Sequence, residues 1–318
     1  MLFLCEKLDF LHDVYLYEKT VCYDYVVDRG GCHMIVVGLT GWGDHPSLYS
    51  GVTTSKDKLF DYTGHFLAVE VDTSFYAIPS KENVRKWCEN TPENFRFIVK
   101  AYQGMTGHLR GDIPFESKND MFNAFIECAY EFKRLGKLGM VLAQFPPWFD
   151  CQSKNVQYLL YIRQQLKDFE VAIEFRNQTW YADNVVQQTM DFLREHQLIH
   201  TICDEPQAGV GSVPFHPVVT ADKALVRIHG RNIHGWRNTG NAENWRKVRF
   251  LYDYNKEELQ QLGQQITKLE TKVQELFILF NNNSGNHAAK NAKELQGILN
   301  IKDVGLAPKQ LNMFEGEL

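Results

Sequence analysis

Residues 66–76, FLAVEVDTSFY, show a pattern that returns along most of the chain: a short apolar run that ends on charged or hydroxyl side chains. Longer stretches with helical periodicity separate this run from seven others. Such an alternation is typical of βα units that build a parallel sheet. The eight runs are MIVVGL (34–39), FLAVEV (66–71), FRFIVK (95–100), GMVLAQF (139–145), EVAIEF (170–175), LIHTIC (198–203), ALVRIH (224–229) and ELFILF (275–280).

Eight runs favour an α/β fold with a single TIM-like (β/α)8 barrel, because a doubly wound sheet usually has about five or six strands. The span from Met34 to Phe280 also matches the ~250 residues of such a barrel. Helices are expected after the start signal Ser117 with Asp120, and over residues 256–273. The unit between strands 6 and 7 is expected to be irregular, because residues 204–222 hold three prolines.

Three segments are predicted: an N-terminal appendage (1–33), the barrel (34–302) and a C-terminal tail (303–318). The appendage holds three of the seven cysteines and ends where the first strand begins. It is either a native N-terminal element that docks through its aromatic residues, or upstream sequence translated from an early start codon. In either case we expect the barrel to fold without it.

The composition excludes several classes of protein. With 44% hydrophobic and 23% charged residues, the chain is neither disordered nor a coiled coil. Its net charge of −5 creates no basic field that would attract nucleic acid or an anionic membrane. Seven cysteines without a CxxC pair indicate neither a disulfide framework nor a zinc ribbon, which suits the cytoplasm. No apolar run approaches the ~18 residues of a membrane span.

The inward-facing side chains at the carboxyl ends of the strands are unusually polar. Alternate residues of a buried parallel strand face the helices and the barrel interior. Barrel active sites lie at this end, and unpaired buried charges are too costly to serve as filler. The polar inward set contains Glu70, Asp72, Lys100, Glu174, Arg176, Arg227, His229 and Arg231.

Three of these residues are candidate catalytic groups. Glu70 and Glu174 could act as general acid and base, or each could hold the mouth of the barrel through an ion pair with Lys100 or Arg176. His229 could transfer protons, since the flanking arginines favour its neutral form, or it could be a hydrogen-bonded core histidine. Lys100 could bind an anion or act as a base, or it could simply pair with Glu70.

The residues after the last strand and the tryptophans suggest a ligand. The turn NNNSGN (281–286) precedes a helix, where free N–H groups favour a phosphate, although a turn rich in capping residues explains it equally well. Trp42, Trp148, Trp180 and Trp236 each follow a strand and could stack on a base or a sugar. The predicted ligand-binding residues are Trp42, Asp72, Tyr76, Lys100, Gln144, Arg176, Trp180, Arg231, Asn281, Asn282 and Asn286. No metal and no cofactor are expected, since HxH and HExxH motifs are absent.

Six ordered motifs resemble the YecE-like family, catalogued as domain of unknown function number 72. They are GLTGWG (38–43), EVDTSFYAIPS (70–80) with WCENTPENFRFIVKA (87–101), GMVLAQFPPWF (139–149), AIEFRNQTWY (172–181), VRIHGR (226–231) and FNNNSGNHAAKNA (280–292). The resemblance implies a TIM-like barrel and a bacterial soluble protein, and it leaves the activity open. The chain departs from the family at Asp72, where asparagine is expected, and at Asn177, where histidine is common.

Three functional hypotheses follow. The first is a metal-independent, hydrolase-like enzyme that acts on a small anionic sugar-like or nucleotide-like substrate. The alternative is a module that binds single-stranded nucleic acid through tryptophans and cations, although the acidic net charge disfavours it. The third is a carrier or scaffold with a vestigial site. The oligomeric state stays open.

Overall fold

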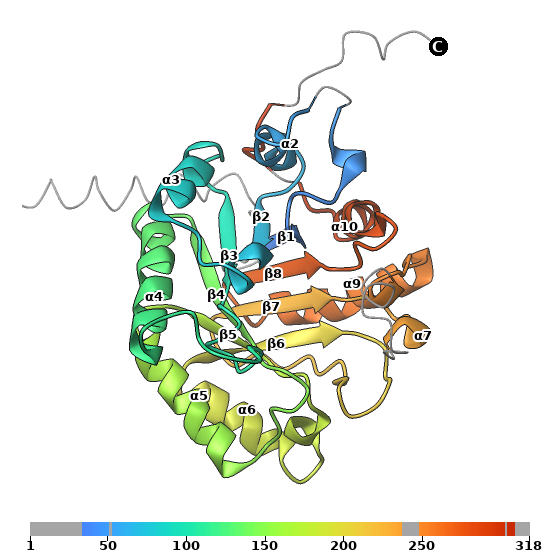
Figure 1. The fold of residues 1–318 in the computed structure, drawn as a ribbon. Helices are drawn as coiled ribbons and strands as arrows, with labels where there is room; N and C mark the ends of the chain where they lie inside the picture. Colours follow the sequence, from blue (N-terminus) through green and yellow to red (C-terminus); the bar gives the residue numbers. More distant parts are fainter. Residues whose placement is uncertain (1–33, 51–52, 237–247, 303, 309–318) are drawn as a thin grey trace, which may run out of the picture.

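The computed structural model describes residues 34–50, 53–236, 248–302 and 304–308, and these form a closed parallel barrel (Figure 1). Each strand pairs with its neighbours in chain order, and β8 closes the barrel against β1. The TIM-like fold is therefore confirmed. The strands are β1 (Met34–Thr40), β2 (Ala68–Val71), β3 (Arg96–Lys100), β4 (Leu138–Gln144), β5 (Val171–Glu174), β6 (Leu198–Asp204), β7 (Lys223–Ile228) and β8 (Glu275–Phe280).

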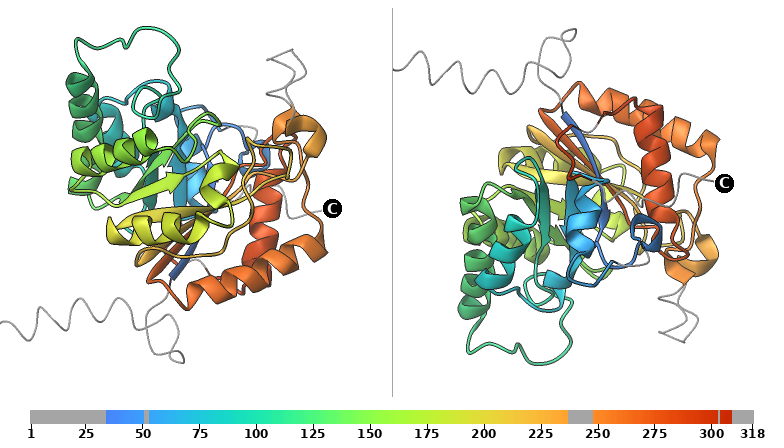
Figure 2. Two further views of the ribbon diagram at one scale, coloured as in Figure 1. Left: turned by 90° about the horizontal axis from the view of Figure 1, so that it is seen from below. Right: turned by 90° about the horizontal axis from the view of Figure 1, so that it is seen from above.

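Helices surround the strands, with α3 to α6 on one side of the barrel and α9 and α10 on another (Figure 2). The predicted start at Ser117 is confirmed, because its hydroxyl accepts a hydrogen bond from Asp120 N at 3.1 Å. Residues 205–222 contain no helix, as their prolines predicted. The described helices are α2 (Lys58–Thr63), α3 (Lys81–Glu89), α4 (Lys118–Arg134), α5 (Ser153–Gln165), α6 (Val186–Glu195), α7 (Ile233–Trp236), α9 (Lys256–Glu270) and α10 (His287–Ile298), with the 3-10 turns η1 (Pro46–Leu48), η2 (Asp72–Phe75) and η3 (Gln178–Tyr181).

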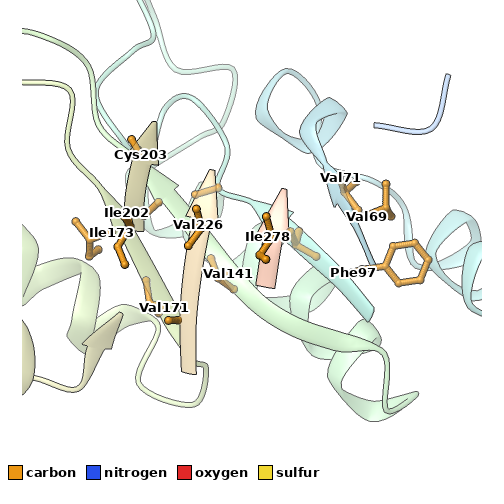
Figure 3. Close-up of a cluster of buried hydrophobic side chains, with 14 of the residues drawn as sticks. Val69, Val71, Phe97, Val141, Val171, Ile173, Ile202, Cys203, Val226 and Ile278 are labelled. Carbon is orange, nitrogen blue, oxygen red and sulfur yellow. The ribbon is translucent and has the colours of Figure 1, made fainter. Parts of the chain in front are cut away.

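The two faces of each strand serve two separate apolar layers. Outward side chains such as Val69, Phe97 and Ile173 pack under the helices (Figure 3). The inward side chains fill the lower part of the barrel and include Val36, Ala68, Ile98, Met140, Leu142, Ala172, Ile199, Leu225, Phe277 and Leu279. This alternation agrees with the inward assignment of Glu70, Lys100, Glu174 and Arg227, because each of them lies two residues after one of these inward apolar side chains.

Gly38 lies inside the barrel where β1 approaches β2 closely. A Cβ atom at this position would lie 2.1 Å from the Ala68 carbonyl oxygen and 3.2 Å from a methyl group of Leu279. Because the obstacle is backbone, Gly38→Ala is expected to lower the free energy of unfolding by roughly 1–3 kcal/mol. Urea denaturation measures this, with Gly43→Ala as the control because nothing lies within 4 Å of its Cβ position. Equal stability of the two variants would contradict the prediction.

The predicted flanking segments are described only in part. Residues 1–33 lie outside the described residues, so the prediction about this appendage stays a prediction. Within the predicted tail, Ala307 N donates a hydrogen bond to Thr63 O at 3.1 Å, and Val304 O accepts one from Asn94 at 2.8 Å. Residues 304–308 are thus bound to the barrel. Among the described helices, none combines the length and hydrophobicity that a membrane span requires.

Candidate functional site

Strands β1 to β7 and the residue after β8 contribute inward polar or ionisable side chains to a layer above the apolar interior. The layer lies at the carboxyl ends of the strands, which is the end where TIM barrels carry their sites. We call these residues the polar layer. They are Thr40, Glu70, Lys100, Gln144, Glu174, Cys203 and Arg227, with Asn281 directly after β8.

Arg227 lies at the centre of the polar layer and joins two glutamates from different parts of the barrel. Its Nε and Nη2 donate to the two oxygens of Glu70 at 2.9 and 2.8 Å, and Nη1 donates to Glu174 Oε2 at 2.5 Å. All three side chains are buried. Glu70 and Glu174 therefore both bind the same guanidinium group. Burial alone would raise the pKa of Glu174, but Arg227 and Arg176 hold it well below its usual value.

Arg176 is fixed between two carboxylates. Its Nε lies 2.9 Å from Glu174 Oε1, and Nη1 donates to Glu205. The other oxygen of Glu205 accepts a hydrogen bond from Val213 N at 2.6 Å, which anchors the segment after β6. Only 3% of the Arg176 surface is exposed, and its guanidinium links Glu174 to Glu205. Its expected contact with a ligand anion stays a prediction.

The His229 ring is held in one orientation and is neutral. Asn281 Nδ2 donates to His229 Nδ1 at 2.9 Å, so the neutral ring carries its proton on Nε2. Nε2 faces Glu174 Oε1 at 3.5 Å. Burial, and next the charge of Arg176, hold the pKa of His229 well below its usual value.

Lys100 and Asp72 are the partly exposed charged groups of this cluster, whereas its other charged side chains are buried. The Lys100 side chain is 14% exposed, and its Nζ lies 3.9 Å from Glu70 Oε1 and 4.9 Å from the centroid of the Phe75 ring. Burial lowers the pKa of Lys100, against the opposing effect of Glu70. Burial and next Glu70 raise the pKa of Asp72. Gly41, with φ of +69°, leaves space for the Asp72 carboxylate, because a Cβ there would lie 3.2 Å from Oδ1.

Aromatic rings connect Lys100 to the surface. Phe75 contacts Tyr76 and His108 with centroid distances of 5.1 and 5.0 Å, and His108 contacts Trp148 at 6.0 Å. Tyr76 and Trp148 are 66% and 55% exposed. Burial, and next the charge of Lys100, lower the pKa of His108 to about 4, so this ring is neutral. We call these four residues the aromatic rim.

A second group of cations lies against Trp236. The Arg176 and Arg249 guanidinium carbons are 5.2 and 4.4 Å from the centroid of the Trp236 ring. Burial, and next the charge of Arg176, lower the pKa of Arg249 to about 9. Two positive charges thus meet in a poorly solvated place.

Arg231 and Trp180, both predicted ligand-binding residues, lie outside the cluster. Arg231 was expected to converge on it, but its guanidinium donates to both oxygens of Asp204 at 2.8 and 2.5 Å and contacts Glu258. Trp180 was expected as a ligand platform, but it is buried under the helices and stacks on Phe175 at 4.3 Å. An indole gains more from this apolar stack than from the polar mouth, and its Nε1 is satisfied by a backbone carbonyl.

The other predicted ligand-binding residues have mixed positions. Gln144 accepts a long hydrogen bond from Arg227 at 3.4 Å, so it belongs to the cluster. Asn282 instead braces the turn, donating to Tyr252 O and to the Asn291 side chain. Asn286 is an exposed left-handed residue ahead of α10, and its side chain makes no capping bond. Trp42 is half-buried and its ring contacts Trp87 at 5.1 Å.

Several residues of the site were absent from the predicted catalytic and ligand-binding residues. Arg227 was placed in the polar inward set but given no role, and Cys203 has the same inward parity. Glu205 comes directly after β6, as an acidic residue at a strand end. His108 comes from a loop, where periodicity gives no signal, and Arg249 lies in the segment between β7 and α9.

Glu174, Cys203 and His229 form the one trio of potential metal ligands within the described ranges, with donor atoms within 4.8 Å of one another. Their states fit a metal ion poorly. Two guanidinium groups already bind Glu174, and the His229 nitrogen nearest to it carries a proton. Burial also raises the pKa of the Cys203 thiol well above its usual value.

The fold and the polar layer define a TIM-barrel protein with a charged cluster at the carboxyl end of its strands. The chain belongs to the family described as "Protein of unknown function DUF72", whose model matches residues 36–313. It is 50% identical over 282 residues to the UPF0759 protein YunF of Bacillus subtilis, covering 88% of this chain and all of that one. The UPF0759 protein YecE of Escherichia coli is 25% identical over 219 residues, which is 62% of this chain and 74% of YecE. A crystal structure of a DUF72 family protein from Enterococcus faecalis superposes with a TM-score of 0.82 at 41% identity, covering 88% of this chain and all of that one.

Proposed function

We propose that the chain is a metal-independent enzyme that binds a small anionic, sugar-like or nucleotide-like molecule at the mouth of the barrel and hydrolyses it. The observation that carries the proposal is the pair of guanidinium groups on Trp236. Burial lowers the pKa of Arg249 there, and the repulsion between Arg249 and Arg176 lowers it further. An anion bound beside them would offset this repulsion, and a guanidinium is suited to phosphate or carboxylate oxygens.

The reactive groups in this proposal are Asp72 and Lys100. Hydrolysis needs one group that donates a proton to the leaving group and one that accepts a proton from water. Burial favours the neutral form of both residues, so the pKa of Asp72 is raised and that of Lys100 is lowered. Glu174 and His229 were expected to transfer protons. Their lowered pKa values make both weak bases, so we assign them to fixing charge and orientation around Arg227.

Thermal-shift titration with inorganic phosphate and a sugar phosphate tests the anion site. Bound anion should stabilise the wild type by about 2.7 kcal/mol at a hundredfold excess over Kd. Arg249→Gln is expected to abolish most of this stabilisation. Arg194→Gln is the matched control, because Arg194 pairs with Asp191 on an exposed face of α6. If Arg249→Gln and the control respond alike to every anion, the anion site is refuted. Release of 4-nitrophenol from its phosphate ester and glycosides, with Asp72→Asn for comparison, tests the hydrolysis.

Trp148 favours a second candidate, the binding of single-stranded nucleic acid. Its exposed ring lies 5.4 Å from the Arg110 guanidinium carbon, which is an arrangement that can stack on a base. Burial of Trp180 and Trp236 removes two of the four platforms on which that hypothesis depended. A steep fall in oligonucleotide affinity with salt, together with weaker binding by Trp148→Ala, would support this candidate over the small-molecule site.

A further inference from the structure

Lys100 differs from the other buried lysines of the described chain in the surroundings of its amine. Lys137 donates to two backbone carbonyls, Thr91 O and Pro92 O, and Lys223 contacts Glu170 and Glu275 at 2.8 and 2.5 Å. The carboxylate nearest to Lys100 Nζ is 3.9 Å away and already accepts two hydrogen bonds from Arg227. Lys100 Nζ therefore has no close hydrogen-bond acceptor among the described residues.

Lys100 Nζ lies at the carboxyl end of the barrel, where TIM barrels carry their reactive groups. Lys100 ends β3 with its side chain inside the barrel, above the apolar interior and beside the aromatic rim. The Phe75 ring covers one side, and 14% of the side chain is exposed to solvent. Asp72 interacts electrostatically with Lys100 and supplies an acidic group at the same end of the barrel.

We propose that Lys100 Nζ is a nucleophile that forms an imine with the carbonyl carbon of an aldehyde or ketone carrying a carboxylate or phosphate group. The inference rests on the small-molecule site proposed above, but not on hydrolysis as its reaction. It narrows the substrate class from anionic molecules in general to anionic carbonyl compounds. The Arg176 and Arg249 pair would bind the anionic group, and Lys100 Nζ would form the bond to the carbonyl carbon.

The step balances without an oxidant or a reductant. The lone pair of neutral Nζ forms the N–C bond, and the electron pair of the C=O bond moves to oxygen, which takes a proton from Asp72. The Asp72 carboxylate then removes a proton from nitrogen, leaving a neutral carbinolamine. Asp72 protonates the hydroxyl group, which leaves as water while the nitrogen lone pair forms the C=N bond. The products are a protonated imine on Lys100, an Asp72 carboxylate and one water molecule.

The electrostatics support this chemistry. Burial, and also the nearby charge of Arg227, lower the pKa of Lys100, which increases the fraction of neutral amine. The raised pKa of Asp72 keeps more of its carboxyl group protonated and able to donate. Each unit by which the pKa of an amine falls raises its neutral fraction about tenfold at neutral pH.

Reductive trapping tests the inference on the full chain. The protein is incubated with pyruvate, glyceraldehyde 3-phosphate or acetaldehyde, then treated with sodium borohydride, and the modified lysines are mapped by peptide mass spectrometry. Lys100 is expected to be labelled at least about tenfold more than the exposed Lys81 and Lys86, because its lowered pKa leaves more of the amine in the neutral, nucleophilic form. Lys137 is the internal control for a buried lysine, and Lys100→Met should lose the dominant adduct while melting as a folded protein.

The outcomes separate the two proposals. Labelling at Lys100 by acetaldehyde, with no stabilisation by any anion, would support the nucleophile and overturn the anion site. Anion binding with label spread over the exposed lysines, and none at Lys100, would overturn the nucleophile alone. If Lys100→Met fails to fold, Lys100→Arg replaces it, and an unchanged adduct yield in either variant contradicts the inference.

Discussion

Arg227→Met is expected to lower the free energy of unfolding by about 3–5 kcal/mol, the range found when one partner of a buried ion pair is removed. Arg227 is the group that neutralises Glu70, and it shares Glu174 with Arg176. Methionine fills much of the space but offers no hydrogen bond. Glu70 would then lose both guanidinium donors that compensate for its removal from water, and Glu174 would keep only one of its two guanidinium partners.

The pH dependence identifies the cause of this loss. In the wild type the pKa of Glu174 lies below its usual 4.5, so its stabilising contribution is present above that pH and is lost as the pH falls through the folded-state pKa. Without Arg227, only Arg176 and His229 oppose the effect of burial, so the pKa of Glu174 rises and protonation of this carboxylate costs less folding free energy at acid pH. The stability difference between wild type and Arg227→Met should therefore shrink below about pH 4.5.

Urea denaturation over a pH series measures the difference. Arg194→Met is the control, because it removes an arginine from an exposed pair that contributes little. A difference for Arg227→Met that stays constant from neutral to acid pH would show that lost packing, not unpaired carboxylates, destabilises the variant.

The sequence was sufficient to predict the barrel and the facing of its strands, for a physical reason. A strand buried on both faces alternates its side chains with a period of two, so Val69 and Phe97 outside imply Glu70 and Lys100 inside. Eight such runs leave few alternatives to closure into a barrel. The position of the charged cluster at the carboxyl ends of the strands followed from the same parity.

The pairing of charges within the cluster could not be predicted from the strands alone. Parity places Arg231 inward, yet it bonds Asp204, which ends the neighbouring strand β6, because that carboxylate lies within reach and is buried. Glu205 reaches the site from an irregular segment after β6, whose course depends on local turns and tertiary contacts, and Arg249 from the connection between β7 and α9. Trp180 follows a strand like Trp148, but only Trp180 finds an aromatic stack beneath it. Which partner each of these side chains contacts depends on tertiary packing, which strand parity does not specify.

Acidification from pH 7 toward pH 5 is expected to destabilise the fold through histidines that are buried in their neutral form. The clearest case is His200, whose Nδ1 donates to Val218 O at 2.9 Å and whose Nε2 accepts from Tyr181 OH at 3.0 Å. Burial lowers the pKa of His200 from 6.5 to about 4. Below pH 6.5 the unfolded chain therefore takes up a proton that the folded state refuses, and stability falls until the pH reaches about 4. This range corresponds to about 3 kcal/mol for His200 alone, and the lowered pKa values of His229 and His45 act in the same direction.

His200→Gln tests this assignment, because glutamine can keep a donor and an acceptor near these partners but does not titrate. The urea midpoint of the wild type should fall steeply between about pH 6.5 and 5, above the range in which carboxylates take up protons. The variant should show a shallower fall, whatever its stability at neutral pH. His234→Gln removes an exposed histidine and should leave the slope unchanged. A slope for His200→Gln equal to that of the wild type would mean that His200 is protonated in the folded state at acid pH, and its bonds to Tyr181 and Val218 would then have to open before the barrel unfolds.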